Sequence, residues 1–225
     1  MDSEHTIVSL KVRGPVLRNF TYLIVDRPSR RAAVVDPAWE LEAIEAKLQQ
    51  LEVSLAAVLL THSHFDHVNC VTPLVDRHPV EVFMSEREID CYGFRCARLN
   101  PVRHGQRLQV GGTEVACLLT PGHTAGGNCY LLNDALFTGD TVFTEGCGVC
   151  TAPGGSAEAM FASFEMLRAE VDREVRVFPG HSFGMEPGQT LGTLLRDNIY
   201  FQIEKREEFV AWRMRAGVSG SFETR

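Results

Sequence analysis

The stretch LLTHSHFDHVNC, residues 59–70, places three histidines and an aspartate within six positions directly after an apolar run. Alternate residues that leave a strand point the same way, so His62 and His64 can bind one metal ion with two imidazoles. Asp66 and His67, where the chain turns into a helix, can face a second ion beside the first. The stretch therefore predicts a site for two metals.

Three further candidate ligands stand where predicted strands give way to loops. They are His123 in LLTPGHT, Asp140 in LFTGDT and His181 in VFPGHS. A glycine precedes each of them, which gives the backbone freedom to aim a side chain at a turn. Five of the eight histidines thus belong to one predicted metal centre, together with two aspartates. Such His/Asp sites accept zinc, iron or manganese.

The composition predicts a single domain. With 225 residues, 44% of them hydrophobic, we expect one domain over residues 1–217, including a C-terminal helix, and a frayed tail over 218–225. No stretch reaches the roughly 18 apolar residues of a membrane span, and no signal segment is evident, so we expect a cytoplasmic protein with reduced cysteines. The formal charge of −7 argues against nucleic acid or a membrane as the main partner.

Strand and helix signals alternate along the chain. Runs over residues 6–12, 20–25 and 31–35 predict a β-meander. Asp36 followed by Pro37 predicts the N-cap and first position of a helix with an apolar stripe. The remaining predicted elements are a buried strand over 55–60, a helix after Asp66, a strand over 80–84, short strands between 107 and 139, a helix capped by Ser156, a strand over 175–178 and one long helix from Leu191 to Gly217.

The motifs THSHFDH, PGHT, TGD and PGHS, in this order, resemble the metal motifs of the metallo-β-lactamase superfamily in its glyoxalase II-like branch. The resemblance implies an α/β (α+β) fold, an αββα sandwich with the metals at one edge between the sheets. It implies that Asp140 bridges two metals and that Asp36 supports the site from behind the ligands. The ligand sets that it implies are His62, His64 and His123 for one metal, and Asp66, His67 and His181 for the other.

Two such ions, zinc being the expected metal with iron or manganese possible, imply hydrolysis. Cations about 3.5–4 Å apart share a hydroxide that is present at neutral pH, and one of them polarises a carbonyl. We expect Asp66 to orient the hydroxide. A thiolate leaves with little help from a general acid, because thiols have a pKa near 8.5. The expected substrate is therefore an acyl thioester.

Residues 137–148, FTGDTVFTEGCG, resemble the glyoxalase II segment. Glyoxalase II enzymes follow GCG with a basic residue and carry tyrosines beyond it and after the last metal histidine. This chain has Val149, Thr151 and Phe183 at those positions. A glutathione thioester is therefore disfavoured.

MSEREIDCYGFRC and EGCGVC resemble the zinc-dependent hydrolases found with bacterial polyketide synthases, the PksB/BaeB type. The resemblance implies removal of acyl groups from acyl carrier proteins, with Val149 and Phe183 bordering the acyl or pantetheine channel. Residues 91–113 contain no acidic residue, which would suit an acidic carrier and its phosphate. The candidate contact residues there are Arg95, Arg98, Arg103 and Arg107. A solvated basic face is the alternative interpretation.

Other functions stay open on the sequence alone. They are glyoxalase II, a persulfide dioxygenase with one iron held by two histidines and an aspartate, a lactonase, and a metal-binding protein without turnover.

Overall fold

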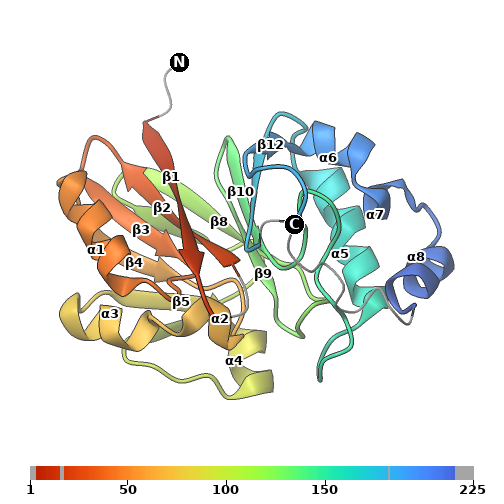
Figure 1. Ribbon diagram of the computed structural model, residues 1–225, viewed down its shortest axis with the longest axis horizontal. Helices are drawn as coiled ribbons and strands as arrows, with labels where there is room; N and C mark the ends of the chain where they lie inside the picture. Colours follow the sequence, from red (N-terminus) through yellow and green to blue (C-terminus); the bar gives the residue numbers. More distant parts are fainter. Residues whose placement is uncertain (1–3, 16–17, 182, 216–225) are drawn as a thin grey trace.

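The computed structural model describes residues 4–15, 18–181 and 183–215. Two β-sheets of six strands pack face to face, and helices cover the outer face of each (Figure 1). The αββα sandwich predicted from the motifs is confirmed.

The first sheet joins an antiparallel meander to a parallel half. Its strands, in spatial order, are β1 (His5–Arg13), β2 (Arg18–Asp26), β3 (Arg31–Val35), β4 (Ser54–Leu59), β5 (Glu81–Ser85) and β6 (Leu99–Val102). The predicted meander is β1 to β3, and β3 to β6 run parallel. Val35 and Leu59 are partners at the ends of β3 and β4, so Asp36 and the metal motif leave the sheet at the same edge.

The second sheet also carries candidate ligands where its strands end. Its strands, in chain order, are β7 (Arg107–Val110), β8 (Thr113–Leu119), β9 (Asn128–Leu131), β10 (Ala135–Gly139), β11 (Arg176–Pro179) and β12 (Gln189–Thr190). Strands β10 and β11 are parallel and end in register at Gly139 and Pro179. Asp140 and His181 therefore emerge beside each other.

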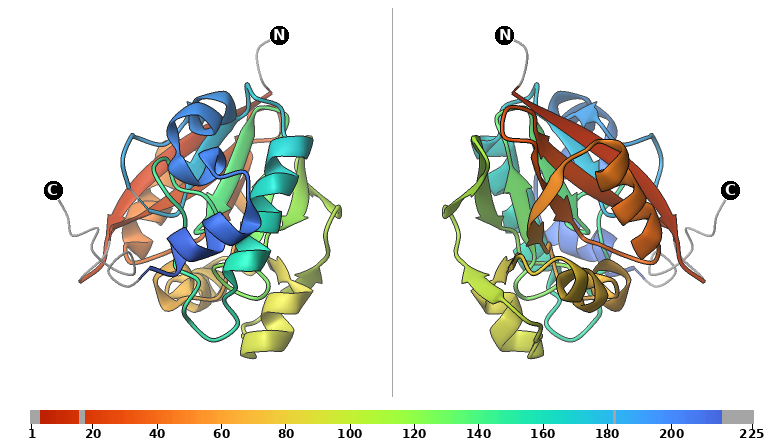
Figure 2. Two further views of the ribbon diagram at one scale, coloured as in Figure 1. Left: turned by 90° about the vertical axis from the view of Figure 1, so that its right-hand side faces the viewer. Right: turned by 90° about the vertical axis from the view of Figure 1, so that its left-hand side faces the viewer.

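The helices form the two outer layers. Those on the side of the first sheet are α1 (Leu41–Gln50), α2 (Phe65–Val68), α3 (Val71–Arg77) and α4 (Glu86–Tyr92). Those on the side of the second sheet are α5 (Ala157–Glu170), α6 (Leu191–Asp197), α7 (Ile199–Gln202) and α8 (Arg206–Arg213). Figure 2 shows the two groups from opposite sides of the sandwich.

Three apolar clusters hold the layers together. Between the sheets, the rings of Tyr22 and Phe178 lie 5.5 Å apart, and Phe137 stacks on Phe178 at 5.4 Å. Ile44 of α1 is buried with its neighbours against the outer face of the first sheet, and Phe164 of α5 is buried with its neighbours against the second. Each fully buried side chain of this size contributes about 1.5–3 kcal/mol. The clusters therefore hold the two sheets together and keep the edges that carry the candidate ligands close to each other.

The predicted helix start at Asp36 is wrong. Helix α1 begins at Leu41 after Glu40, and Asp36 has a φ of 48°, outside the helical region. The Asp36 carboxylate is instead buried and accepts hydrogen bonds from the Thr61 backbone nitrogen at 2.8 Å and its hydroxyl at 2.6 Å. An acid engaged in this way cannot cap a helix.

The single C-terminal helix is also wrong, because the segment forms α6, α7 and α8. Asn198 has a ψ of 119° and ends α6, and Ile203 and Lys205 are extended as well. The Asn198 amide donates to the carbonyls of Phe143 and Gly146, so a tertiary contact interrupts the helical pattern. The predicted end at Gly217 and the tail over 218–225 lie outside the described residues.

Candidate metal centre

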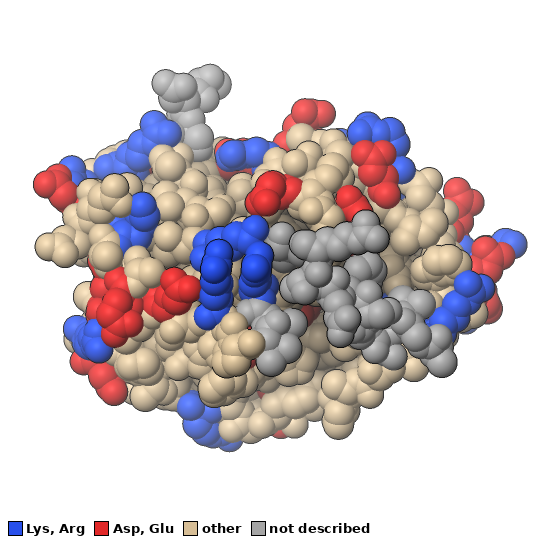
Figure 3. Space-filling model, in the orientation of Figure 1, with Lys and Arg blue, Asp and Glu red and all other residues tan. Residues whose placement is uncertain are grey.

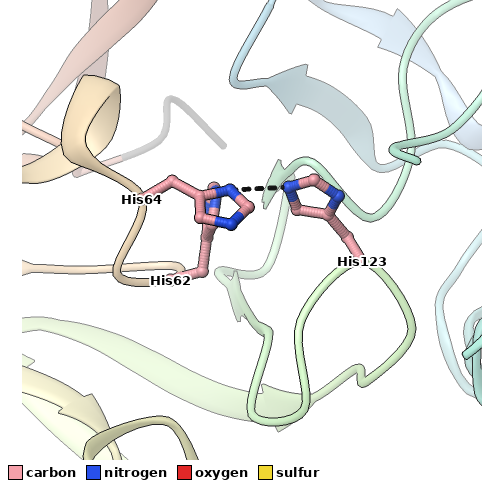
Figure 4. A group of neighbouring side chains, drawn as sticks. All are labelled: His62, His64 and His123. Carbon is pink, nitrogen blue, oxygen red and sulfur yellow. Dashed lines mark hydrogen bonds between the residues drawn. The ribbon is translucent and has the colours of Figure 1, made fainter. Parts of the chain in front are cut away.

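Three imidazoles converge from two loops. His62 and His64 lie between β4 and α2, and His123 follows β8 (Figure 4). The His64 Nδ1 atom lies 3.1 Å from Nε2 of His62 and 2.9 Å from Nε2 of His123. Two nitrogens bound to one tetrahedral zinc at about 2.0–2.1 Å are roughly 3.3 Å apart. The three nitrogens could therefore hold one metal ion.

A second group lies beside the first and contains Asp66, His67 and His181. The Nε2 atom of His181 is 3.3 Å from Oδ2 of Asp66 and 3.3 Å from Nε2 of His67. Two nitrogens and a carboxylate oxygen at this separation suit a second metal ion.

Asp140 stands between the two groups. Its Oδ2 atom lies 3.4 Å from Nε2 of His123 and 3.4 Å from Nε2 of His181, one member of each group. Its buried Oδ1 atom lies 3.4 Å from Nε2 of His67 and has no hydrogen-bond partner among the described residues. An unsatisfied buried carboxylate oxygen is costly, and a cation would satisfy it. The side chains thus fit a pair of metal ions.

Apart from His64, each imidazole of the cluster is held in place by a hydrogen bond through the ring nitrogen that faces away from the cluster. Such contacts set the tautomer and orientation of a metal-binding histidine. The Nδ1 contacts are His62 with the Thr61 hydroxyl at 3.0 Å, His67 with the Asp36 carboxylate at 2.9 Å, His123 with the Val149 carbonyl at 2.7 Å and His181 with the Arg18 carbonyl at 3.0 Å. Asp36 thus contacts the cluster from behind, as the resemblance implies.

The glycines before the candidate ligands allow close packing of neighbouring side chains as well as a turn of the backbone. A Cβ atom on Gly180 would lie 2.6 Å from Cε1 of His67 and 2.7 Å from Oδ1 of Asp140. Gly139 has a φ of 47°, and its Cβ would collide with Thr61. Side chains at these positions would displace the cluster.

The pKa shifts differ between the two groups of candidate ligands. Burial lowers the pKa of His62 well below its ordinary value, and the charge of His67 lowers it further. Burial alone would raise the pKa of both aspartates, but His181 and His67 outweigh it, leaving Asp140 well below its ordinary value and Asp66 at a pKa of about 2. Burial would also lower the pKa of His67 and His181, but the Asp140 carboxylate outweighs it and raises both, so a metal ion would displace protons from these two imidazoles when it binds.

Val149 and Phe183, both expected at the substrate channel, lie next to the cluster. The Val149 carbonyl accepts the hydrogen bond from His123. The ring of Phe183 lies 5.7 Å from that of His181 and 4.8 Å from that of Phe143.

The arginine-rich segment is compensated by acids from other elements. Arg98 pairs with Glu81 at 3.1 Å, Arg103 pairs with Glu86 at 2.8 Å, and Arg107 pairs with Glu114. Arg95 is exposed and donates to the carbonyl of its neighbour Phe94. The apparent excess of positive charge in the linear sequence is thus largely balanced on the folded surface.

Sequence reasoning missed two arginines close to the site. Arg13 and Arg18 face each other at the ends of β1 and β2, both exposed, and His181 contacts the Arg18 backbone. Neither forms an ion pair with a carboxylate in the part of the chain that the structure describes. In the orientation of Figure 1, basic side chains cluster near the middle of the visible face (Figure 3). The pairing of β1 with β2 brings the two together, and their positions on either side of the connection between the first two predicted strands were the available signal.

An aromatic pair at the site was missed as well. Phe65 is 71% exposed although it lies inside the metal motif, and its ring meets that of Trp39 edge-on at 5.8 Å. The Trp39 indole donates to Asn19, whose amide donates to the Asp66 carboxylate at 3.2 Å. A large apolar side chain between polar ligands was the available signal.

A model of the metallo-beta-lactamase superfamily matches residues 14–181, and the chain belongs to this superfamily. The probable polyketide biosynthesis zinc-dependent hydrolase BaeB of Bacillus velezensis is 50% identical over 222 residues, 99% of each chain. The human hydroxyacylglutathione hydrolase-like protein is 38% identical over 176 residues, 74% of this chain and 57% of that one. The crystal structure of ETHE1 from Myxococcus xanthus has a TM-score of 0.81 at 29% identity and covers 90% of this chain and 88% of its own. The resemblance inferred from the motifs is confirmed.

None of the helices in the described part of the chain has the length and hydrophobicity needed to cross a bilayer.

Proposed function

We propose that this chain is a zinc-dependent hydrolase of acyl thioesters and that its substrate is an acyl group on the phosphopantetheine arm of an acyl carrier protein in polyketide biosynthesis. The observation that carries the hydrolase is the convergence of seven histidine and aspartate side chains into two groups joined by Asp140. The polyketide setting is inferred from BaeB, which shares half of its residues with this chain along the whole length.

The two groups assign the ligands. We assign His62, His64 and His123 to one zinc ion and Asp66, His67 and His181 to the other. Asp140 is assigned to both because its Oδ2 atom lies 3.4 Å from a histidine of each group. Two zinc ions bound there would supply a hydroxide at neutral pH and polarise the substrate carbonyl.

The chain's own residues position the nucleophile. The side chain of Asp66 is 19% exposed, and its low pKa keeps it ionised at neutral pH, so it can accept a hydrogen bond from the attacking water. Asn19 donates to both the carbonyl and the carboxylate of Asp66 and restricts its rotation. A fixed acceptor lowers the entropic cost of orienting the water.

The protonation states of the two aspartates favour a thioester substrate over an amide. Asp66 and Asp140 are both ionised, so neither carboxylate stores a proton for a leaving group. An amine must be protonated as it departs, whereas a thiolate leaves with little assistance because thiols have a pKa near 8.5.

The surroundings of the cluster suit a long thiol carrier. Val149, Phe183 and the pair of Phe65 and Trp39 offer apolar surface for the acyl chain or pantetheine. A hydroxyacylglutathione hydrolase is the second candidate, favoured by the 38% identity to the human relative. The apolar residues at positions 149 and 183 favour the carrier protein over glutathione.

A comparison of thiol carriers tests the proposal. The same acyl group would be presented on an acyl carrier protein, on glutathione and on N-acetylcysteamine to protein of known zinc content. We expect kcat/KM for the carrier protein to exceed that for the other two by at least tenfold. A preference for glutathione would make the chain a glyoxalase II-type enzyme, and no hydrolysis of any thioester would contradict the proposal.

A further inference from the structure

A buried glutamate outside the cluster contacts both loops that carry the first metal group. Glu88 lies in α4 and has 0% of its side chain exposed. Its Oε1 atom accepts from the backbone nitrogen of Ser63 at 2.8 Å and from the Ser63 hydroxyl at 2.7 Å. Its Oε2 atom accepts from the backbone nitrogen of Gly126 at 3.0 Å. No lysine or arginine in the described ranges forms an ion pair with it.

The local sequence would assign this carboxylate a different role. Ser85, the N-cap of α4, accepts a hydrogen bond from the Glu88 nitrogen, which is one half of a capping box. In a complete box the glutamate three residues later returns the bond to the backbone of the cap. Here the carboxylate turns away from its own helix and contacts Ser63 and Gly126. The buried Glu88 carboxylate therefore binds these two loops and not the backbone of its own helix cap.

The contacts lie next to the metal ligands. Ser63 separates His62 from His64, and Gly126 is three residues after His123. The Gly126 backbone also packs directly on the backbone of Glu88, where a Cβ atom would collide with α4. Ser85 reinforces the junction by donating to the Gly126 carbonyl. One side chain thus joins the loop after β4 to the loop after β8.

We infer that Glu88 is the positioning residue that sets the distance between His123 and the pair His62 and His64, and thereby the zinc affinity of this group. The inference rests on the metal-binding part of the proposed function and not on the substrate. Groups that orient metal ligands from behind typically change metal affinity 10- to 100-fold when they are removed. Within the described part of the chain, Glu88 forms no hydrogen bond with Asp66, His67 or His181, so the effect is selective for one of the two ions.

Glu88→Gln tests this selectivity. Glutamine keeps one oxygen for Ser63 but turns an NH2 group toward the Gly126 nitrogen, where two donors then face each other. We expect chelator competition to show at least a tenfold loss of affinity for one zinc ion, with the other changed less than threefold. The cobalt-substituted variant should lose the same absorption bands as His123→Ala and keep those lost in His181→Ala. Equal affinity for both ions, or equal loss at both, would overturn the inference.

Controls separate positioning from general destabilisation. Thr190→Ala removes the N-cap of α6, on the other helical layer, and should lower the melting temperature while leaving both zinc affinities unchanged. If Glu88→Gln does not fold, Ser63→Ala removes only one of the three hydrogen bonds and should weaken the same ion several-fold; unchanged binding in that variant would overturn the inference. A wild-type protein that binds fewer than two ions would instead contradict the proposed function.

Discussion

Single residues in the site are held by contacts to the rest of the chain. His67 points its Nδ1 atom at Asp36, and Asp36 is held in turn by both donors of Thr61. This chain of hydrogen bonds links a proposed metal ligand to the ends of β3 and β4. Metal affinity should therefore depend on residues that would not touch the metal.

Asp36→Asn is expected to weaken zinc binding at the second group 10- to 100-fold, because the amide cannot accept from both Thr61 and His67 as the carboxylate does. Chelator competition with purified protein would measure the loss. Asp76→Asn, an exposed carboxylate of α3, is the matched control and should change nothing. Wild-type affinity in the Asp36 variant would show that His67 is positioned by other contacts.

The residues that we assign as ligands could be singled out from the sequence because each lies in a short motif at a strand end, and the structure brings their side chains together. Glu88 and Asn19 could not, because their importance lies in contacts with residues 25 and 47 positions away. The helix-capping role that the Asp36-Pro37 pair predicts is wrong for a similar reason. The Asp36-Pro37 pair fits the local pattern of a helix start, and the contact between Asp36 and Thr61 cannot be seen in a linear sequence.

At the level of elements, the helices of the second layer depend on packing more than on their own propensity. Helix α8 is only eight residues long, and its Phe209 is completely buried against Phe161 and Phe164 of α5. Isolated helices of this length are unstable in water. The sequence pattern predicted one continuous helix, and it could not reveal that Asn198 divides the segment or that Ile199 is 47% exposed.

Phe209→Ala should therefore lower the free energy of unfolding by about 3–5 kcal/mol, the usual cost of a cavity of this size. Urea denaturation followed by circular dichroism would measure it. Met214→Ala, at a side chain 48% exposed, should stay within about 0.5 kcal/mol of the wild type. A similarly small effect of Phe209→Ala would mean that α8 does not pack as described.

The paired ends of β1 and β2 make a second prediction at this scale. Replacing Arg13 and Arg18 together by glutamine should raise KM for an acyl carrier protein substrate about tenfold at low salt and leave kcat unchanged, because the pair would attract an acidic partner. Arg103→Gln is the control, since Arg103 is already paired with Glu86. An equal KM in the double variant and the control would exclude Arg13 and Arg18 from substrate recognition.

At the scale of the whole molecule, the candidate metal centre joins the two halves of the chain. We propose that residues 1–217 form one domain, because the core between the sheets draws on both halves and the ligands come from both. The order of the strands and the edge at which they end could be anticipated from the motifs. The distances between the ligand atoms could not, because they depend on the packing of the two sheets.

Zinc removal is expected to destabilise the whole domain. Ligand bound at a thousand times its dissociation constant stabilises a fold by about 4 kcal/mol, which corresponds to roughly 10 °C in melting temperature for a chain of this size. Scanning calorimetry before and after dialysis against a chelator would detect the shift. Restoring zinc should restore the transition, and an unchanged melting temperature would mean that the cluster does not bind the metal tightly.

The decisive measurement is the rate of hydrolysis of an acyl thioester on an acyl carrier protein as zinc is titrated into metal-free protein. Activity should appear with zinc, reach its maximum at two ions per chain and require no oxygen. Activity that is independent of zinc, or a protein that binds one iron and consumes oxygen instead of hydrolysing the thioester, would contradict a two-zinc hydrolase.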